Sequence, residues 1–200
     1  MQTVVVSFAA EILFLVWAAV KMGKEMKKTA KTTFCAMMAA LAVAVMLLSY
    51  FPYLTYAIPA VAGLFIMVAL IETNKCWAFM SYIASAVLVF LFADPESRFL
   101  YVFFFGYYPI IKALTERLKK PVFEWIIKFT VFNVSVLTVY ILFANFFSFS
   151  IEEFGTFGKY GALILLVLGN IVFILYDIAV SRIAAVYINM LHPKIKKLLR

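Results

Sequence analysis

The sequence predicts an all-α integral membrane protein: a bundle of six transmembrane helices plus an extra N-terminal hydrophobic helix. Of its 200 residues, 66% are hydrophobic and only 14% are charged, and the mean hydropathy is +1.04. Soluble domains are about half apolar and about a quarter charged. A soluble fold of this size has too much surface for its volume to hide such an excess of apolar side chains. The apolar runs are continuous rather than alternating, which excludes a membrane barrel of strands.

Six apolar runs are long enough to be membrane-spanning helices, since a span takes about 20 residues. Polar and proline-containing turns separate them. The runs cover residues 33–51, 55–72, 77–93, 99–113, 122–147 and 161–190. Before them lies a further hydrophobic segment, residues 1–25, with Glu11 at its centre. We expect it to be a helix that either lies in the membrane interface or spans the membrane, and residues 26–200 to form the six-helix domain.

Lysine and arginine give the expected orientation, because short cytoplasmic loops are enriched in both. If the residues before the first certain span are cytoplasmic, all of the 18 lysines and arginines except Arg98 and Lys159 fall on the cytoplasmic side. Both ends of the six-helix domain are then cytoplasmic. The formal net charge of +8 follows from this topology and from contact with anionic lipid. We therefore expect a lipid bilayer and no nucleic acid as partner.

Several functions are disfavoured by what the sequence lacks. There is a single histidine, His192, and there are two cysteines, Cys35 and Cys76, which does not suggest a metal site or a histidine-based triad. The sequence contains no Gly-x-Ser-x-Gly elbow and no phosphate-binding loop of the Walker type. We expect no enzymatic activity, no metal and no cofactor.

Polar residues within the apolar runs are the candidates for interhelical contacts or ligand contacts. Glu124 and Lys128 are four residues apart and are expected to form a structural ion pair. Asp177 is expected to pair with either Arg182 or Lys112, and a structural role is favoured over proton transfer. The remaining candidates are amides, which are costly to leave unpaired in the membrane and so bond across helices or to a ligand: Asn133, Asn145 and Asn170.

Two of the runs carry further patterns. Ala36, Ala40 and Ala44 recur every fourth residue, so they form one stripe on the first certain span, where another helix can approach closely. That helix belongs either to the same bundle or to a separate membrane subunit. In the fourth span, Gly106 and Pro109 predict a kink. Its tyrosines either pack around that kink or form the wall of a small-molecule cavity.

Taken together, these features resemble the substrate-binding S components of energy-coupling factor importers. The resemblance covers roughly residues 26–200 and rests on the basic, threonine-rich start at 27–33, the alanine stripe, the six helices and Phe-Phe-Gly-Tyr-Tyr-Pro-Ile-Ile-Lys at 104–112. The extra segment 1–25 departs from the family pattern.

The resemblance implies a protein of the bacterial plasma membrane that captures a vitamin or related micronutrient from outside. Ala36, Ala40 and Ala44 would dock on a coupling transmembrane subunit that works with two cytoplasmic ATPases. The implied substrate-binding residues are in the outer loops and in the fourth to sixth spans: Tyr53, Arg98, Tyr101, Tyr107, Tyr108, Asn133, Asn145 and Asn170.

Two alternatives come from other functional classes. A structural membrane protein of the cell-shape or envelope machinery would need no outer pocket, so Tyr107, Asn133 and Asn170 would pack against one another. A small ion-coupled carrier would be centred on Asp177 and Lys112, and its activity would depend on pH.

Overall fold

The computed structural model describes residues 28–51, 54–118, 120–147 and 161–192, and this part of the chain is all helical. The extra segment 1–25 and Tyr53 lie outside the described residues, as does the side chain of Asn145. The elements are α2 (Lys28–Met46), η1 (Leu47–Tyr50), α3 (Ala57–Glu72), α4 (Lys75–Phe92), α5 (Pro95–Leu100), η2 (Tyr101–Phe105), α6 (Tyr108–Thr115), η3 (Glu116–Leu118), α7 (Pro121–Phe147) and α8 (Gly161–Met190).

Four segments of the described chain are long and apolar enough to cross a membrane. They are Lys28–Tyr50, which comprises α2 and η1, then α4, residues Pro121–Leu142 of α7 and residues Leu166–Met190 of α8. Large apolar side chains on these helices remain exposed, Leu91 and Val172 among them, as expected where lipid is the solvent. The chain is therefore a multi-pass helical membrane protein.

The expected count of six spans and one extra helix is not confirmed. One expected span is a helix too short to cross the membrane, and another is divided among several elements. α3 is apolar but has only 16 residues. At 1.5 Å per residue it is about 24 Å long, short of the ~30 Å hydrocarbon core. The fourth expected span, 99–113, is divided among α5, η2 and α6.

The break in the fourth span lies where Gly106 and Pro109 predicted a kink. η2 is a π-helical turn, and the Gly106 amide donates to the carbonyl of Tyr101 at 2.8 Å. α6 then begins at Tyr108 with Pro109 in its first turn. Proline is tolerated there because the first N–H groups of a helix have no helical acceptor to bond. A Cβ at Gly106 would lie 2.7 Å from the Tyr82 ring, so the close approach of α4 also requires glycine here.

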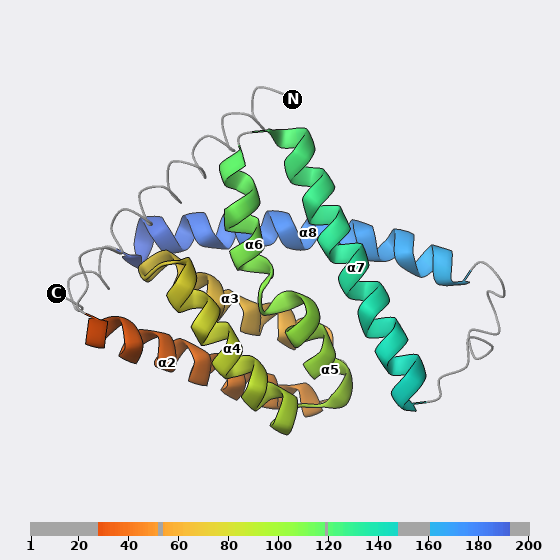
Figure 1. Ribbon diagram of the computed structural model, residues 1–200, viewed down its shortest axis with the longest axis horizontal. Coiled ribbons are helices and arrows are strands. Elements are labelled where there is room, and N and C mark those ends of the chain that lie inside the picture. The colour runs from red at the N-terminus through yellow and green to blue at the C-terminus, as the bar shows by residue number, and fades with distance from the viewer. Residues whose placement is uncertain (1–27, 52–53, 119, 148–160, 193–200) are drawn as a thin grey trace.

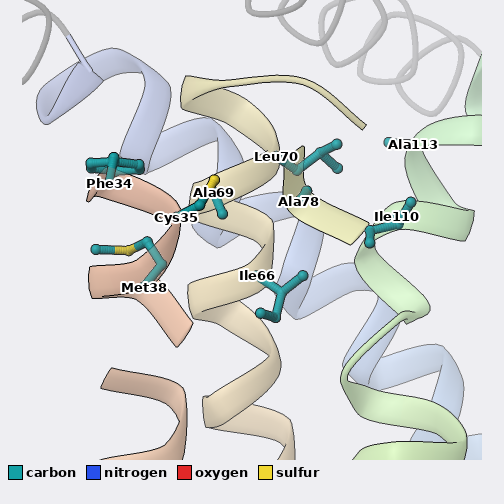
Figure 2. Close-up of a cluster of buried hydrophobic side chains, with 9 residues drawn as sticks. All are labelled: Phe34, Cys35, Met38, Ile66, Ala69, Leu70, Ala78, Ile110 and Ala113. Atoms are coloured by element: carbon teal, nitrogen blue, oxygen red, sulfur yellow. The ribbon is translucent and has the colours of Figure 1, made fainter. Parts of the chain in front are cut away.

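Helices α2, α3 and α4 pack together on one side of the molecule, and α7 crosses α8 on the other (Figure 1). α6 lies between the two groups and contacts both. Figure 2 shows the apolar cluster that joins α6 to the first group, made of Phe34, Cys35, Met38, Ile66, Ala69, Leu70, Ala78, Ile110 and Ala113.

A second, aromatic cluster joins α6 to α7 and α8. Phe104 of η2, Tyr108 of α6 and Phe173 of α8 are buried together. Phe132 of α7 stacks on Phe173 with 4.7 Å between the ring centroids. These rings hold the three elements at the spacing that the polar contacts described next require.

Candidate functional site

A buried charge network connects α6, α7 and α8. Its centre is the carboxylate of Asp177, which accepts hydrogen bonds from Lys112 Nζ at 2.5 Å and from Lys128 Nζ at 3.1 Å. The Tyr108 hydroxyl donates to the same carboxylate at 2.5 Å. The side chains of Asp177 and Lys128 are only 6% and 2% exposed. Each of the three helices therefore contributes at least one charged side chain to the network.

Two glutamates extend the network toward the ends of α6 and α7. Lys112 Nζ lies 2.8 Å from Glu116 Oε1, and Lys128 Nζ lies 2.7 Å from Glu124 Oε1. Lys128 Nζ also lies 3.5 Å from Glu116 Oε1. The network thus contains three carboxylates and two ammonium groups.

Local helix geometry explains how the sequence assembles these groups. Tyr108, Lys112 and Glu116 are spaced four residues apart, so they follow one face of α6 and its continuation. Glu124 and Lys128 have the same spacing within the first two turns or so of α7. Asp177, near the middle of α8, has no ion-pair partner on its own helix among the described residues, so burial there depends on the lysines of the other two helices.

The sequence anticipated part of this arrangement. Glu124 and Lys128 lie within ion-pair distance, and of the two partners considered for Asp177 the structure selects Lys112. Arg182 is exposed, and in the described chain no ion pair joins it to Asp177, so that alternative is wrong. Sequence reasoning missed Glu116, although its spacing from Lys112 was a usable signal.

Polar side chains that follow Lys128 in α7 and precede Asp177 in α8 form a second set of hydrogen bonds. Asn133 and Asn170 exchange two side-chain hydrogen bonds, at 3.1 Å and 3.2 Å. Each amide also donates to a carbonyl of its own helix. Tyr107 and Ser135 are hydrogen-bonded at 2.7 Å. Asn133, Asn170 and Tyr107 are half-buried.

The other expected binding residues are separate from this region. Tyr101 is fully buried and hydrogen-bonds to Ser85 at 2.7 Å, on the side of η2 that faces α4. Arg98 Nη1 donates to the Phe90 carbonyl at 3.3 Å, and its guanidinium lies over the Phe90 ring. Tyr108 belongs to the charge network. Those of the expected binding residues whose side chains the structure describes therefore fall into separate groups, and the ligand role of all eight stays a prediction.

The alanine stripe faces outward. Ala36, Ala40 and Ala44 are exposed, whereas Ala39 and Ala42 of the same helix are buried against the bundle. The small-residue face of α2 is thus left uncovered by the described part of the chain.

A second polar cluster ties α3 to the end of α8. Glu72 Oε1 accepts from the Tyr187 hydroxyl at 2.8 Å and lies 2.9 Å from His192 Nδ1. All three side chains are buried. In the described residues, no group of three or more histidine, cysteine, aspartate or glutamate side chains is placed to hold a metal ion.

The chain was compared with family models, with curated proteins and with solved structures, and nothing matches it. Functional assignment therefore rests on the geometry of its own residues.

Proposed function

We propose that this protein is a substrate-capturing membrane subunit of an importer, similar to the S components of energy-coupling factor systems. In this role it binds a vitamin or related micronutrient at the outer face of a bacterial plasma membrane. A coupling transmembrane subunit and two cytoplasmic ATPases supply the energy for release inside. The C-terminus is then cytoplasmic, as the distribution of lysine and arginine predicts.

The observation that carries this proposal is the exposure of one alanine stripe on α2. If Ala36, Ala40 and Ala44 served only internal packing, they would face the bundle as Ala39 and Ala42 do. Lipid tails give no hydrophobic drive for helix association, so a surface of small side chains favours close van der Waals packing against another helix. A separate coupling subunit would supply that helix.

The best-placed ligand contacts are the half-buried polar side chains between α7 and α8. Asn133 and Asn170 together offer amide donors and carbonyl acceptors, and in the structure these groups hydrogen-bond to each other. A ligand with an amide or carboxylate group can replace that mutual pair without leaving a buried amide unsatisfied. The ring of Phe132, which is only partly buried and lies on the same helix as Asn133, provides an apolar surface for a ligand.

The docking part of the proposal is tested by enlarging one alanine of the stripe. The protein is co-expressed with a candidate coupling subunit and the two ATPases, and the complex is isolated through a tag on the coupling subunit. Ala40→Leu is expected to abolish co-purification, whereas Ala84→Leu, which enlarges an exposed alanine on α4, is expected to leave it intact. Equal recovery of the two variants would contradict the docking role of α2.

Two other functions make different predictions. A structural protein of the envelope machinery is favoured by the mutual pairing of Asn133 and Asn170, and it would bind no small ligand. An ion-coupled carrier is favoured by the buried charge at Asp177, and it would transport without partner subunits and lose activity in Asp177→Asn. Transport by the chain alone in vesicles would favour the carrier.

A further inference from the structure

Arg98 lies beyond one end of a helix that is long and apolar enough to cross a membrane. α4 has 18 residues and ends at Phe92, and Arg98 follows in the last turn of α5. At 1.5 Å per residue α4 is about 27 Å long, close to the ~30 Å thickness of the hydrocarbon core. The end of α4 and the Arg98 side chain beside it are therefore at the level where the lipid headgroups begin.

Two aromatic rings fix the direction of this side chain. The guanidinium carbon of Arg98 lies 5.2 Å from the centroid of the Phe90 ring and 5.4 Å from that of the Phe99 ring. The two rings themselves pack edge to face, with 6.0 Å between their centroids. The guanidinium is thus held beside the last turn of α4 and does not extend away from the protein into water.

Most hydrogen-bond donors of this guanidinium are left for a partner from outside the described chain. A guanidinium has five N–H groups. One of those on Nη1 donates to the Phe90 carbonyl at 3.3 Å, near the C-terminal end of α4. Nε is buried and has no partner among the described residues. Capping of α4 thus accounts for a single donor, and Nη2 and the second hydrogen of Nη1 are placed to bind two oxygens of one anionic group.

The carboxylates nearest to Arg98 in the sequence bind other groups. Asp94 accepts from the backbone amides of Glu96 and Ser97 and so caps α5. Glu96 accepts from the Tyr56 hydroxyl at 3.3 Å. Over the described residues, Arg98 takes part in no ion pair. Neither neighbouring carboxylate is therefore the anionic group that Nη1 and Nη2 bind.

The surface around Arg98 is one that lipid covers. Phe90, Leu91 and Phe92, the last three residues of α4, are all exposed, as expected for side chains in contact with lipid tails. A phospholipid carries a negatively charged phosphate directly above its tails. Arginine binds phosphate through two parallel N–H···O bonds, which gives this pair both charge and shape complementarity.

We propose that Arg98 binds the phosphate of a membrane phospholipid whose tails lie against the last turn of α4. Nη1 and Nη2 donate to two phosphate oxygens, while the Phe90 carbonyl and the two rings keep the guanidinium in place. The contact anchors this end of α4 at the membrane surface, and it assigns Arg98 to lipid instead of to a captured substrate. It requires only a bilayer, so it is independent of the proposed importer role.

Solid-state NMR of the full-length protein in lipid vesicles tests this contact through the dipolar coupling between arginine Cζ and lipid phosphorus. The Arg98 signal is the one that is missing from Arg98→Gln and from Arg98→Lys, of which the second keeps the positive charge. In vesicles of phosphatidylethanolamine and phosphatidylglycerol, we expect phosphorus to dephase this signal, as a direct arginine–phosphate contact with a Cζ–P distance of about 4–5 Å requires. Arg117→Gln, at an exposed arginine that follows the fourth expected span, is the matched control and is expected to keep the dephased signal.

Two results would overturn the inference. An Arg98 signal that lipid phosphorus does not dephase would show that the guanidinium only caps α4. The second comparison uses vesicles of a phosphorus-free glycolipid with inorganic phosphate in the buffer, where we expect no dephasing. Dephasing in that sample would assign the site to a free phosphate ion and not to a lipid headgroup.

Discussion

Replacing Lys128 by methionine removes the cation that joins α7 to α8. The side chain of Lys128 is 2% exposed and has close contacts at 2.7 Å with Glu124 and at 3.1 Å with Asp177. A hydrogen bond to a charged group contributes about 1.5–3 kcal/mol, and breaking a buried ion pair by removing one partner costs about 3–5 kcal/mol. We therefore expect Lys128→Met to lower the free energy of unfolding by about 3–5 kcal/mol.

Unfolding of purified protein in mild detergent, followed by circular dichroism against denaturant, measures this loss. Lys120→Met, at an exposed lysine of the same region, is the control and should change stability by less than about 0.5 kcal/mol. Asp177→Leu combined with Lys128→Met should cost less than the sum of the two single changes, by about 1–3 kcal/mol. Equal effects at Lys128 and Lys120, or strictly additive effects in the double variant, would refute the network as a source of stability.

Three further predictions follow from other parts of the molecule. Gly63→Ala places a Cβ against the backbone oxygen of Phe105 in the π turn, so thermal unfolding should show a loss of about 1–3 kcal/mol, and an unchanged midpoint would contradict the packing of α3 on that turn. Asn133→Leu should leave the Asn170 amide short of a partner and cost about 1–3 kcal/mol, whereas the double leucine variant should unfold at a higher temperature than either single variant. A cysteine at Glu96 should react with an impermeant thiol reagent on intact cells and one at Lys120 only after permeabilisation; the opposite pattern would invert the orientation.

The positions of the helices followed largely from the sequence. Hydropathy placed the last helix at 161–190, as found, and placed the preceding one within a residue of its observed start at Pro121. The first helix is already formed at Lys28, where the described residues begin, and so includes polar residues before the apolar run that starts at residue 33, because hydropathy does not register polar helical turns. α5 begins before its apolar run for a related reason, since the Asp94 side chain caps it.

The contacts between helices were predictable only where both partners lie on one helix. The Glu124–Lys128 pair could be deduced from four-residue spacing. Lys112 and Asp177 are 65 residues apart, and their contact depends on how α6 and α8 are rotated about their axes. Hydropathy carries little information on that rotation for helices that are apolar on nearly all sides. Glu116 follows the expected end of its span and its burial depends on α7, although its four-residue spacing from Lys112 made that contact deducible.

The partners of the expected binding residues were likewise not predictable from the sequence. Sequence alone identified Tyr101, Tyr107 and Tyr108 as neighbours on one helix, but the π turn directs them toward different partners: Ser85, Ser135 and Asp177. A π turn changes the angular position of every residue that follows it, so the face of each tyrosine could not be assigned from regular helical spacing.

Native mass spectrometry of the detergent-purified protein tests the proposed capture of a small molecule most directly. We expect a reproducible additional mass of a few hundred daltons, retained from the cell or acquired on incubation with a panel of vitamins, and reduced when Asn133 and Asn170 are both replaced by leucine. A protein that stays free of ligand with every member of the panel would contradict the account and favour a structural role in the membrane.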